Sequence, residues 1–294
     1  MTISQLLARG RPTVSFEFFP PKTPEGEANL VRTIDALRPL GPSYISVTRT
    51  GGKPREATIE LVARIERLGI PAAAHITAIE ATGADIAAAL ELIAARDIRN
   101  LVTLRGDVPK DAGFQRPAGG FRYAADLVAF VKKRAPGLCL AGACHPEGHP
   151  ETRDLPVEVE HLRAKVDAGL DLVITNMFYV NAHYFAFVER LRRAGIGVPV
   201  VAGLMPITNL AQMRRMAELC GAEFPEPLRR RLEQLAGDPA GSLAVGVEWM
   251  TAQAAELLRN GCPGLHFYTL NQSPATRAIF EQLRAQGLLP HPGA

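Results

Sequence analysis

Short runs rich in aliphatic and β-branched residues alternate along the chain with longer segments in which apolar residues recur about every three to four positions. The longer segments have the period of helices with one buried face, and the short runs have the length and composition of strands. The predicted strands are Val14–Phe19, Tyr44–Thr48, Ala72–Thr77, Asn100–Leu104, Leu138–Cys144, Leu172–Thr175, Val198–Leu204 and Gly264–Leu270. This alternation predicts repeated βα units that form a parallel sheet.

Eight strands without a glycine-rich dinucleotide fingerprint favour a single (β/α)8 TIM barrel over a doubly wound sheet. We expect residues 1–294 to form one catalytic barrel domain, with extra helices between Gly221 and Asn260, before strand eight. Several helical segments end in a glycine, such as Gly69 and Gly195, where only glycine enters the left-handed region without strain. The loops that follow the strands are where such a barrel carries its chemistry.

The composition excludes several classes of protein. With 47% apolar residues and a net charge of +3, the chain gives no reason to expect a nucleic-acid or membrane-surface partner. Four cysteines without metal-binding spacing indicate free thiols in a reducing cytoplasm. There is no run of 18 apolar residues, so we expect no membrane span and a cytoplasmic location. Association into a homo-oligomer stays open.

Glu17 lies in the strand run VSFEFF, on the same face as Ser15 and opposite to Phe16 and Phe18. Burial among aromatic rings disfavours the charged form of a carboxylate, so we expect its pKa to be raised and the acid to be protonated near neutrality. That state suits a general acid. The alternative, of equal weight from the residues alone, is a structural glutamate paired with a buried arginine.

Other strand ends also carry polar residues. Strand four ends in Arg105-Gly106-Asp107, which offers a cation, a close backbone approach and an anion, although a loop ion pair explains the same residues. Strand five is followed by HPEGHPE, whose prolines prevent the helical spacing that aligns two histidines on one metal. We therefore expect no metal there, and hydrogen bonding to an organic ligand instead. A lysine is absent from every predicted strand, which argues against a Schiff-base aldolase.

Seven motifs, in order, resemble the methylenetetrahydrofolate reductase family. They are FEFFPPK, SVT, AHIT, LRGD, HPEGHPE, KVDAG and HFYTLN, and they extend from about Ser15 to Ala278 at the predicted strand ends. The resemblance implies reduction of 5,10-methylenetetrahydrofolate to 5-methyltetrahydrofolate, with NADH or NADPH as the source of hydride. It makes Glu17 the general acid that opens the imidazolidine ring to a 5-iminium cation, and Asp107 the anion that stabilises this cation.

Several positions depart from the family pattern at the residues that hold FAD. A tyrosine commonly follows the threonine of SVT, whereas this chain has Arg49. The aromatic residue that opens the loop after strand five is replaced by His145. The usual Asp, Asn and Arg before KVDAG become Glu158, His161 and Ala164, and loss of the arginine removes a bidentate donor for the flavin phosphates.

The resemblance assigns two groups of binding residues. For the cofactor they are Thr48, Arg49, His75, Arg105, Gly106, Tyr123, His145, His149 and Lys165. For the folate they are Asn176, Gln212, Tyr268 and Gln272, the first and last of which replace the family's glutamine and arginine.

Three hypotheses follow. In the favoured one, FAD is absent and the nicotinamide nucleotide takes its place, delivering hydride directly in a ternary complex. In the second, FAD is bound loosely and the kinetics are ping-pong. A third, of another class, is a barrel that binds a folate or pterin for carriage or methyl transfer without redox chemistry. A metal-dependent lyase that uses His145 and His149 is a further rival.

Overall fold

The computed structural model describes residues 1–49, 54–108 and 113–289 of the chain. Within them, eight parallel strands form a closed barrel in the order β1 to β8, and β8 pairs with β1 to complete the ring. The strands are β1 (Thr13–Phe18), β2 (Tyr44–Val47), β3 (Ala72–Thr77), β4 (Asn100–Leu104), β5 (Cys139–Cys144), β6 (Leu172–Thr175), β7 (Val200–Leu204) and β8 (Gly264–Tyr268). The predicted (β/α)8 barrel is confirmed.

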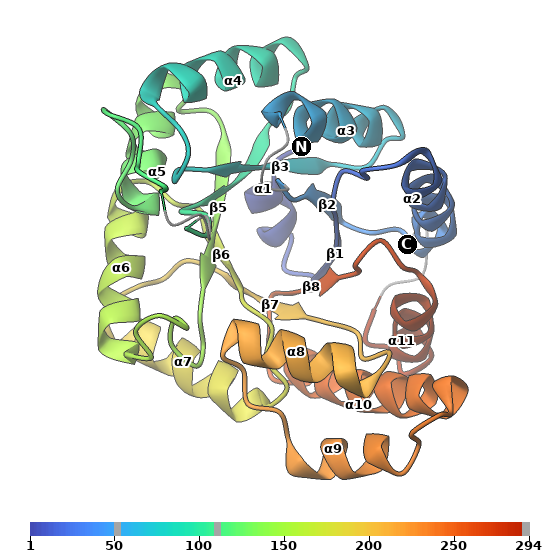
Figure 1. The fold of residues 1–294 in the computed structure, drawn as a ribbon. Coiled ribbons are helices and arrows are strands. Elements are labelled where there is room, and N and C mark those ends of the chain that lie inside the picture. Colours follow the sequence, from blue (N-terminus) through green and yellow to red (C-terminus); the bar gives the residue numbers. More distant parts are fainter. Residues whose placement is uncertain (50–53, 109–112, 290–294) are drawn as a thin grey trace.

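Helices surround the barrel (Figure 1). They are α1 (Ile3–Leu7), α2 (Pro24–Leu37), α3 (Arg55–Arg67), α4 (Gly83–Ala95), α5 (Ala124–Arg134), α6 (Leu155–Asp167), α7 (Asn181–Arg193), α8 (Leu210–Cys220), α9 (Glu226–Glu233), α10 (Pro239–Arg259) and α11 (Pro274–Ala285), with a short 3-10 helix η1 (Arg38–Leu40). Helices α9 and α10 are the extra helices predicted before strand eight. Among the described residues, no helix combines the length and apolarity needed to cross a membrane.

The barrel has an inner and an outer apolar layer, because successive strand residues face opposite sides. The outer layer, which includes Phe16, Phe18 and Phe267, packs against the helices. The inner layer is built mainly from small and aliphatic side chains, and α1 closes it at the amino-terminal end with Ile3 and Leu6. This filled interior leaves the carboxyl ends of the strands as the place for a binding site.

Two predicted strand boundaries differ from the structure by two residues, and four others, at β1, β2 and β5, differ by one. Strand β7 begins at Val200 rather than Val198, because Pro199 has no N–H to donate to the sheet. Strand β8 ends at Tyr268 rather than Leu270, because Leu270 and Asn271 have φ angles of 51° and 55°. The Asn271 side chain then bonds the backbone of Phe19, accepting from its N–H at 3.1 Å and donating to its carbonyl at 3.0 Å.

Candidate active site

A cavity of about 990 Å³ lies at the carboxyl ends of the strands, between the ends of β2 to β5 and helices α5 and α6. Its lining includes all but one of the residues expected to bind the cofactor, and it includes Asp107. The predicted residues that line it are Thr48, Arg49, Arg105, Gly106, Asp107, Tyr123, His145, His149 and Lys165. The residues expected to bind the cofactor, from Thr48 to Lys165, therefore gather at one cavity, with His75 as the exception.

Arg49 follows β2 and forms part of one wall of this cavity. Its Nη1 donates to the Thr77 hydroxyl at 2.5 Å and to the Glu80 carboxylate at 2.9 Å. The Arg49 side chain is only 10% exposed, and its Nε has no hydrogen-bond partner within the described part of the chain. A buried cation with an unused donor is costly, so this position favours an anionic or carbonyl-bearing ligand.

Arg105, Gly106 and Asp107 form the middle of the cavity after β4. Arg105 makes a two-pronged contact with Glu151 from the β5–α6 loop, at 2.8 and 2.6 Å, and this hydrogen bonding raises the pKa of the guanidinium. Gly106 has φ +82°, and a Cβ there would lie 2.9 Å from the Ile79 side chain. Only glycine fits this turn, which places Asp107 on the exposed edge of the cavity.

The wall formed by α6 is held by a buried carboxylate. Glu158 is 3% exposed and accepts hydrogen bonds from the backbone and ring of His145, at 3.0 and 3.1 Å. Burial raises the pKa of Glu158, but the His145 contacts outweigh burial and the net pKa is lowered. Lys165 is also engaged, since its Nζ donates to the Ala143 carbonyl at 2.6 Å. Ala164 lines the same wall without a polar atom to offer.

A second, smaller cavity of about 180 Å³ lies between the ends of β7 and β8 and the start of α10. Tyr268 and Gln272, both expected to bind folate, line it together with Thr208. Gln212 does not line this cavity but contacts a residue that does, since its Oε1 accepts from the Thr208 hydroxyl at 3.3 Å. Asn176 lies outside both linings, and its amide donates to the Cys220 carbonyl at 3.2 Å.

Glu17 lies in β1 between two histidines. Its Oε2 is 3.3 Å from Nε2 of His75 in β3 and 3.3 Å from Nε2 of His266 in β8. Burial raises the pKa of Glu17, but the charge and hydrogen bonds of His75 and His266 together outweigh burial, and the net pKa is lowered well below its usual range. The expectation of a raised pKa was therefore wrong for the protein without ligand. The expected alternative partner, a buried arginine, was wrong as well.

Comparisons with known proteins identify the family of this chain. The family model described as methylenetetrahydrofolate reductase matches residues 2–284. The chain belongs to the methylenetetrahydrofolate reductase family. A 5,10-methylenetetrahydrofolate reductase of Salmonella typhimurium is 35% identical, and the alignment covers 96% of this chain and 94% of that protein.

Two longer relatives match at similar identity. Methylenetetrahydrofolate reductase 1 of Schizosaccharomyces pombe is 35% identical over 92% of this chain, and methylenetetrahydrofolate reductase (NADH) 1 of Arabidopsis thaliana is 33% identical over 96%. This chain spans about half the length of these two relatives, 46% and 50%. A protein of Clostridium thermocellum that binds 5-methyl-5,6,7,8-tetrahydrofolic acid has a TM-score of 0.68 at 14% identity and covers 97% of this chain and 98% of its own, which shows likeness of fold.

The structure adds three residues that sequence reasoning did not assign to the site. His266 Nε2 faces the Glu17 carboxylate, and the Ser15 hydroxyl contacts His266 Nδ1. Glu80 forms the ion pair with Arg49. His75 was expected to bind the cofactor, but its described contact is with Glu17 rather than with the cavity lining. The alternation of β8 does place His266 on the inner face with Tyr268, so this signal was available.

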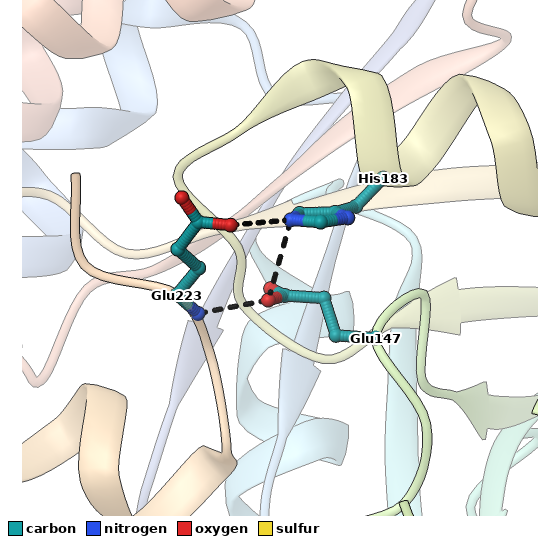
Figure 2. Close-up of side chains that lie close together, drawn as sticks. All are labelled: Glu147, His183 and Glu223. Atoms are coloured by element: carbon teal, nitrogen blue, oxygen red, sulfur yellow. Dashed lines mark hydrogen bonds and ion pairs between the residues drawn. The ribbon is translucent and has the colours of Figure 1, made fainter. Parts of the chain in front are cut away.

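A cluster of potential metal ligands lies elsewhere on the barrel, formed by Glu147, His183 and Glu223 (Figure 2). Their ligand atoms lie within 4.8 Å of one another. In the structure these groups satisfy one another: His183 Nε2 is 2.8 Å from the Glu223 carboxylate, and the Glu223 N–H donates to Glu147 at 2.8 Å. His145 and His149, considered above for a metal, are not part of this cluster and pack ring against ring at 4.6 Å.

Proposed function

We propose that this chain reduces 5,10-methylenetetrahydrofolate to 5-methyltetrahydrofolate with NADH or NADPH. The hydride passes directly from the nucleotide to the folate in a ternary complex, without FAD. The observation that carries the proposal is the Glu17 carboxylate at the end of β1, held by two histidines in a chain of this family. The Arabidopsis relative is named as an NADH enzyme, which supports a nicotinamide nucleotide as the second substrate.

Glu17 and Asp107 divide the chemistry between them. When the imidazolidine ring opens, one of its nitrogens takes the bonding electron pair and needs a proton, which Glu17 supplies. The remaining carbon–nitrogen unit is a cationic iminium, and the Asp107 carboxylate stabilises it electrostatically. The carbon then accepts hydride. Asp107 lies on the rim of the larger cavity. The reacting carbon is therefore expected between this rim and Glu17 in β1.

The two cavities suit the two substrates. The larger one, of about 990 Å³, has the size of a site for a small molecule or nucleotide and carries Arg49, Arg105 and Lys165 along its walls. The smaller one contains Tyr268 and Gln272, which were expected to contact the folate. Tyr268 is fixed there by its hydroxyl, which donates to the Thr175 carbonyl at 2.7 Å. We infer that the nucleotide occupies the larger cavity and that the folate extends towards the smaller one.

The residues around the larger cavity fit FAD poorly. Arg49 forms one wall, and it is held in place by Glu80 and Thr77. On the α6 wall, Ala164 offers no donor to a phosphate and Glu158 adds a buried negative charge. Arg49 and Ala164 therefore stand where the resemblance places residues that hold FAD, which supports the flavin-free reaction. Loose FAD binding with ping-pong kinetics is the alternative, and a non-redox folate carrier is the alternative of another class.

Initial-velocity measurements test the reaction and its order. We expect oxidation of NADH that depends on methylenetetrahydrofolate, intersecting lines when both substrates are varied, and no flavin absorbance in the desalted protein. Parallel lines with a yellow protein would establish the FAD-dependent alternative. Tight folate binding without any nucleotide oxidation would establish the carrier.

Glu17→Gln tests the acid. We expect kcat to fall by at least about a hundredfold, as for loss of a general acid, while folate binding is largely retained. His183→Gln is the matched control, because His183 is a similarly polar residue in the cluster of Figure 2, outside the proposed site. Near-normal turnover in Glu17→Gln would refute the assigned role.

A further inference from the structure

The two ring nitrogens of His266 both face groups that can accept a hydrogen bond. Nε2 faces the Glu17 carboxylate at 3.3 Å, and a carboxylate can only accept. Nδ1 is 2.7 Å from the Ser15 hydroxyl, and this hydroxyl has its own acceptor, the Leu265 carbonyl, at 3.3 Å. With the serine proton directed to Leu265, both nitrogens of His266 act as donors. An imidazole that donates from both nitrogens is the charged, protonated form.

The surroundings of this group favour keeping a proton within it. His266 and its partner Ser15 are fully buried, and Glu17 is 19% exposed, so the carboxylate charge is weakly screened. His75 Nε2 lies 3.3 Å from the same Glu17 oxygen, within ion-pair distance, but neither ring nitrogen of His75 has a hydrogen-bond partner of good geometry within the described residues. A buried carboxylate between two imidazoles is stable when one proton is shared between the carboxylate and a ring.

The other titratable groups that face Glu17 are neutral hydroxyls. Tyr44 in β2 stacks on the His266 ring at 6.2 Å, and Tyr268 in β8 packs edge-on at 5.2 Å. Burial raises the pKa of both tyrosines, with the Glu17 charge as a smaller cause, so neither supplies a proton near neutrality. Ser46 donates to Glu17 at 3.3 Å and does not titrate.

We propose that the proton which Glu17 delivers is stored on His266, so that the acid of the reaction is a Ser15–His266–Glu17 unit rather than Glu17 alone. This proposal rests on the proposed function. As the carbon–nitrogen bond of the imidazolidine breaks, its electron pair goes to nitrogen. Glu17, ionised at rest, takes the Nε2 proton of His266 and passes a proton to that nitrogen, so Glu17 is ionised again at the end of the step. His266 is left neutral, and a proton from water restores it after the product leaves.

The unit makes a prediction that a merely structural histidine does not. Without His266, the pKa of Glu17 rises, because the partner that favours its charged form is gone and burial remains. His266→Gln therefore has to use a proton held by Glu17 itself. We expect its kcat at neutral pH to fall by at least about tenfold and to recover as the pH is lowered. Ser15→Ala, which removes the acceptor for Nδ1, is expected to shift the profile in the same direction.

Infrared titration of the Glu17 carboxyl locates the proton without turnover. The band of the protonated acid is identified by its loss in Glu17→Gln. In the wild type we expect Glu17 to be ionised at neutral pH, where the enzyme is active, and in His266→Gln we expect its titration to move to higher pH and to coincide with the pH dependence of kcat. His183→Gln is the control and is expected to match the wild type in both measurements.

Three results would overturn the proposal: a Glu17 carboxyl that is protonated at neutral pH in the wild type, a His266→Gln variant slowed equally at every pH, or one that is not slowed. Circular dichroism and thermal unfolding show whether a variant is folded before it is compared. If the wild-type protein does not reduce methylenetetrahydrofolate, the proposed function fails, whereas the infrared titration still decides whether the proton resides on His266 or on Glu17.

Discussion

The ion pair between Arg49 and Glu80 gives the most direct test of how the cavity wall is built. We choose Glu80→Gln, which keeps the size of the side chain and removes only its charge. Arg49 would then retain the Thr77 hydroxyl and a neutral amide oxygen as acceptors but no counterion at this contact, while its side chain stays 10% exposed. A second cation, Arg55 at the start of α3, is close enough for the charge of Arg49 to lower its pKa, after burial as the larger cause. Loss of Glu80 leaves these two charges without their shared counterion.

The expected loss in the free energy of unfolding follows from how deeply the Arg49–Glu80 pair is buried. Breaking a fully buried pair costs about 3–5 kcal/mol, whereas a fully exposed pair contributes about 0–1 kcal/mol. Arg49 is nearly buried but the Glu80 side chain is 33% exposed, so water partly screens the interaction. We therefore expect Glu80→Gln to lower the free energy of unfolding by about 2 kcal/mol. For a chain of 294 residues, whose entropy of unfolding is about 2.1 cal/mol/K per residue, this corresponds to a decrease in Tm of about 3 °C.

Chemical denaturation and differential scanning calorimetry measure both quantities. The matched control is Glu281→Gln, which removes the same charge from an exposed pair with Arg277 on α11, where the side chains are 53% and 59% exposed. The control is expected to leave the free energy of unfolding nearly unchanged, because water screens an exposed pair. Equal stability of the two variants would refute the reasoning, because it would mean that Arg49 is solvated as well as a surface arginine.

Three further predictions follow from other parts of the structure. Gly203→Ala is expected to destabilise the fold by about 1–3 kcal/mol, since its Cβ would lie 2.1 Å from a β6 carbonyl and 2.8 Å from the Tyr268 ring. Gly197→Ala is the control, because the space around Gly197 is open. Equal denaturation midpoints for the two variants would contradict this prediction. The lowered pKa of Glu158 means that its stabilising contact with His145 is present above the ordinary value of 4.5 and is lost as the pH falls through the lowered pKa. Unfolding curves of wild type and Glu158→Gln should therefore differ at neutral pH and converge in acid, and a constant difference would contradict the assignment. Exhaustive chelation is expected to leave reductase activity unchanged, and a loss reversed by added zinc would instead favour a catalytic metal.

The sequence was sufficient to predict the barrel, and most of the residues expected to bind the cofactor line one cavity. Strand period and glycine-terminated helices depend on residues close together in the chain, so they can be read locally. The end of β8 could not be read in this way. Leu270 is apolar and continues the strand pattern, but it adopts φ 51° because Asn271 is bonded to the backbone of Phe19, which is distant in the chain.

The pKa of Glu17 likewise could not be predicted from residues close to it in the chain. Its aromatic sequence neighbours predict burial correctly, and burial by itself raises the pKa. Phe16 and Phe18, however, point outward to the helices, and the inner face brings histidines from β3 and β8 instead. Which inner-facing residues of different strands meet depends on the register of the closed sheet, and one residue of slip would exchange the two faces. The sign of the pKa shift is therefore a property of the closed barrel.

The pairing of β1 with β8 is the step that creates the acid. Glu17 and His266 are separated by 249 positions, and they meet only because β8 returns to β1, with Ser15 directly opposite His266 in the register. The same seam is fixed by the Thr269 hydroxyl, which donates to the Glu17 carbonyl at 2.6 Å, and by Asn271 on Phe19. The backbone contacts that close the barrel thus also set the distance between the carboxylate and the ring. Any change that opens this seam is expected to remove the proposed proton relay before it unfolds the rest of the barrel, because Ser15 and Glu17 reach His266 across the β1–β8 pairing.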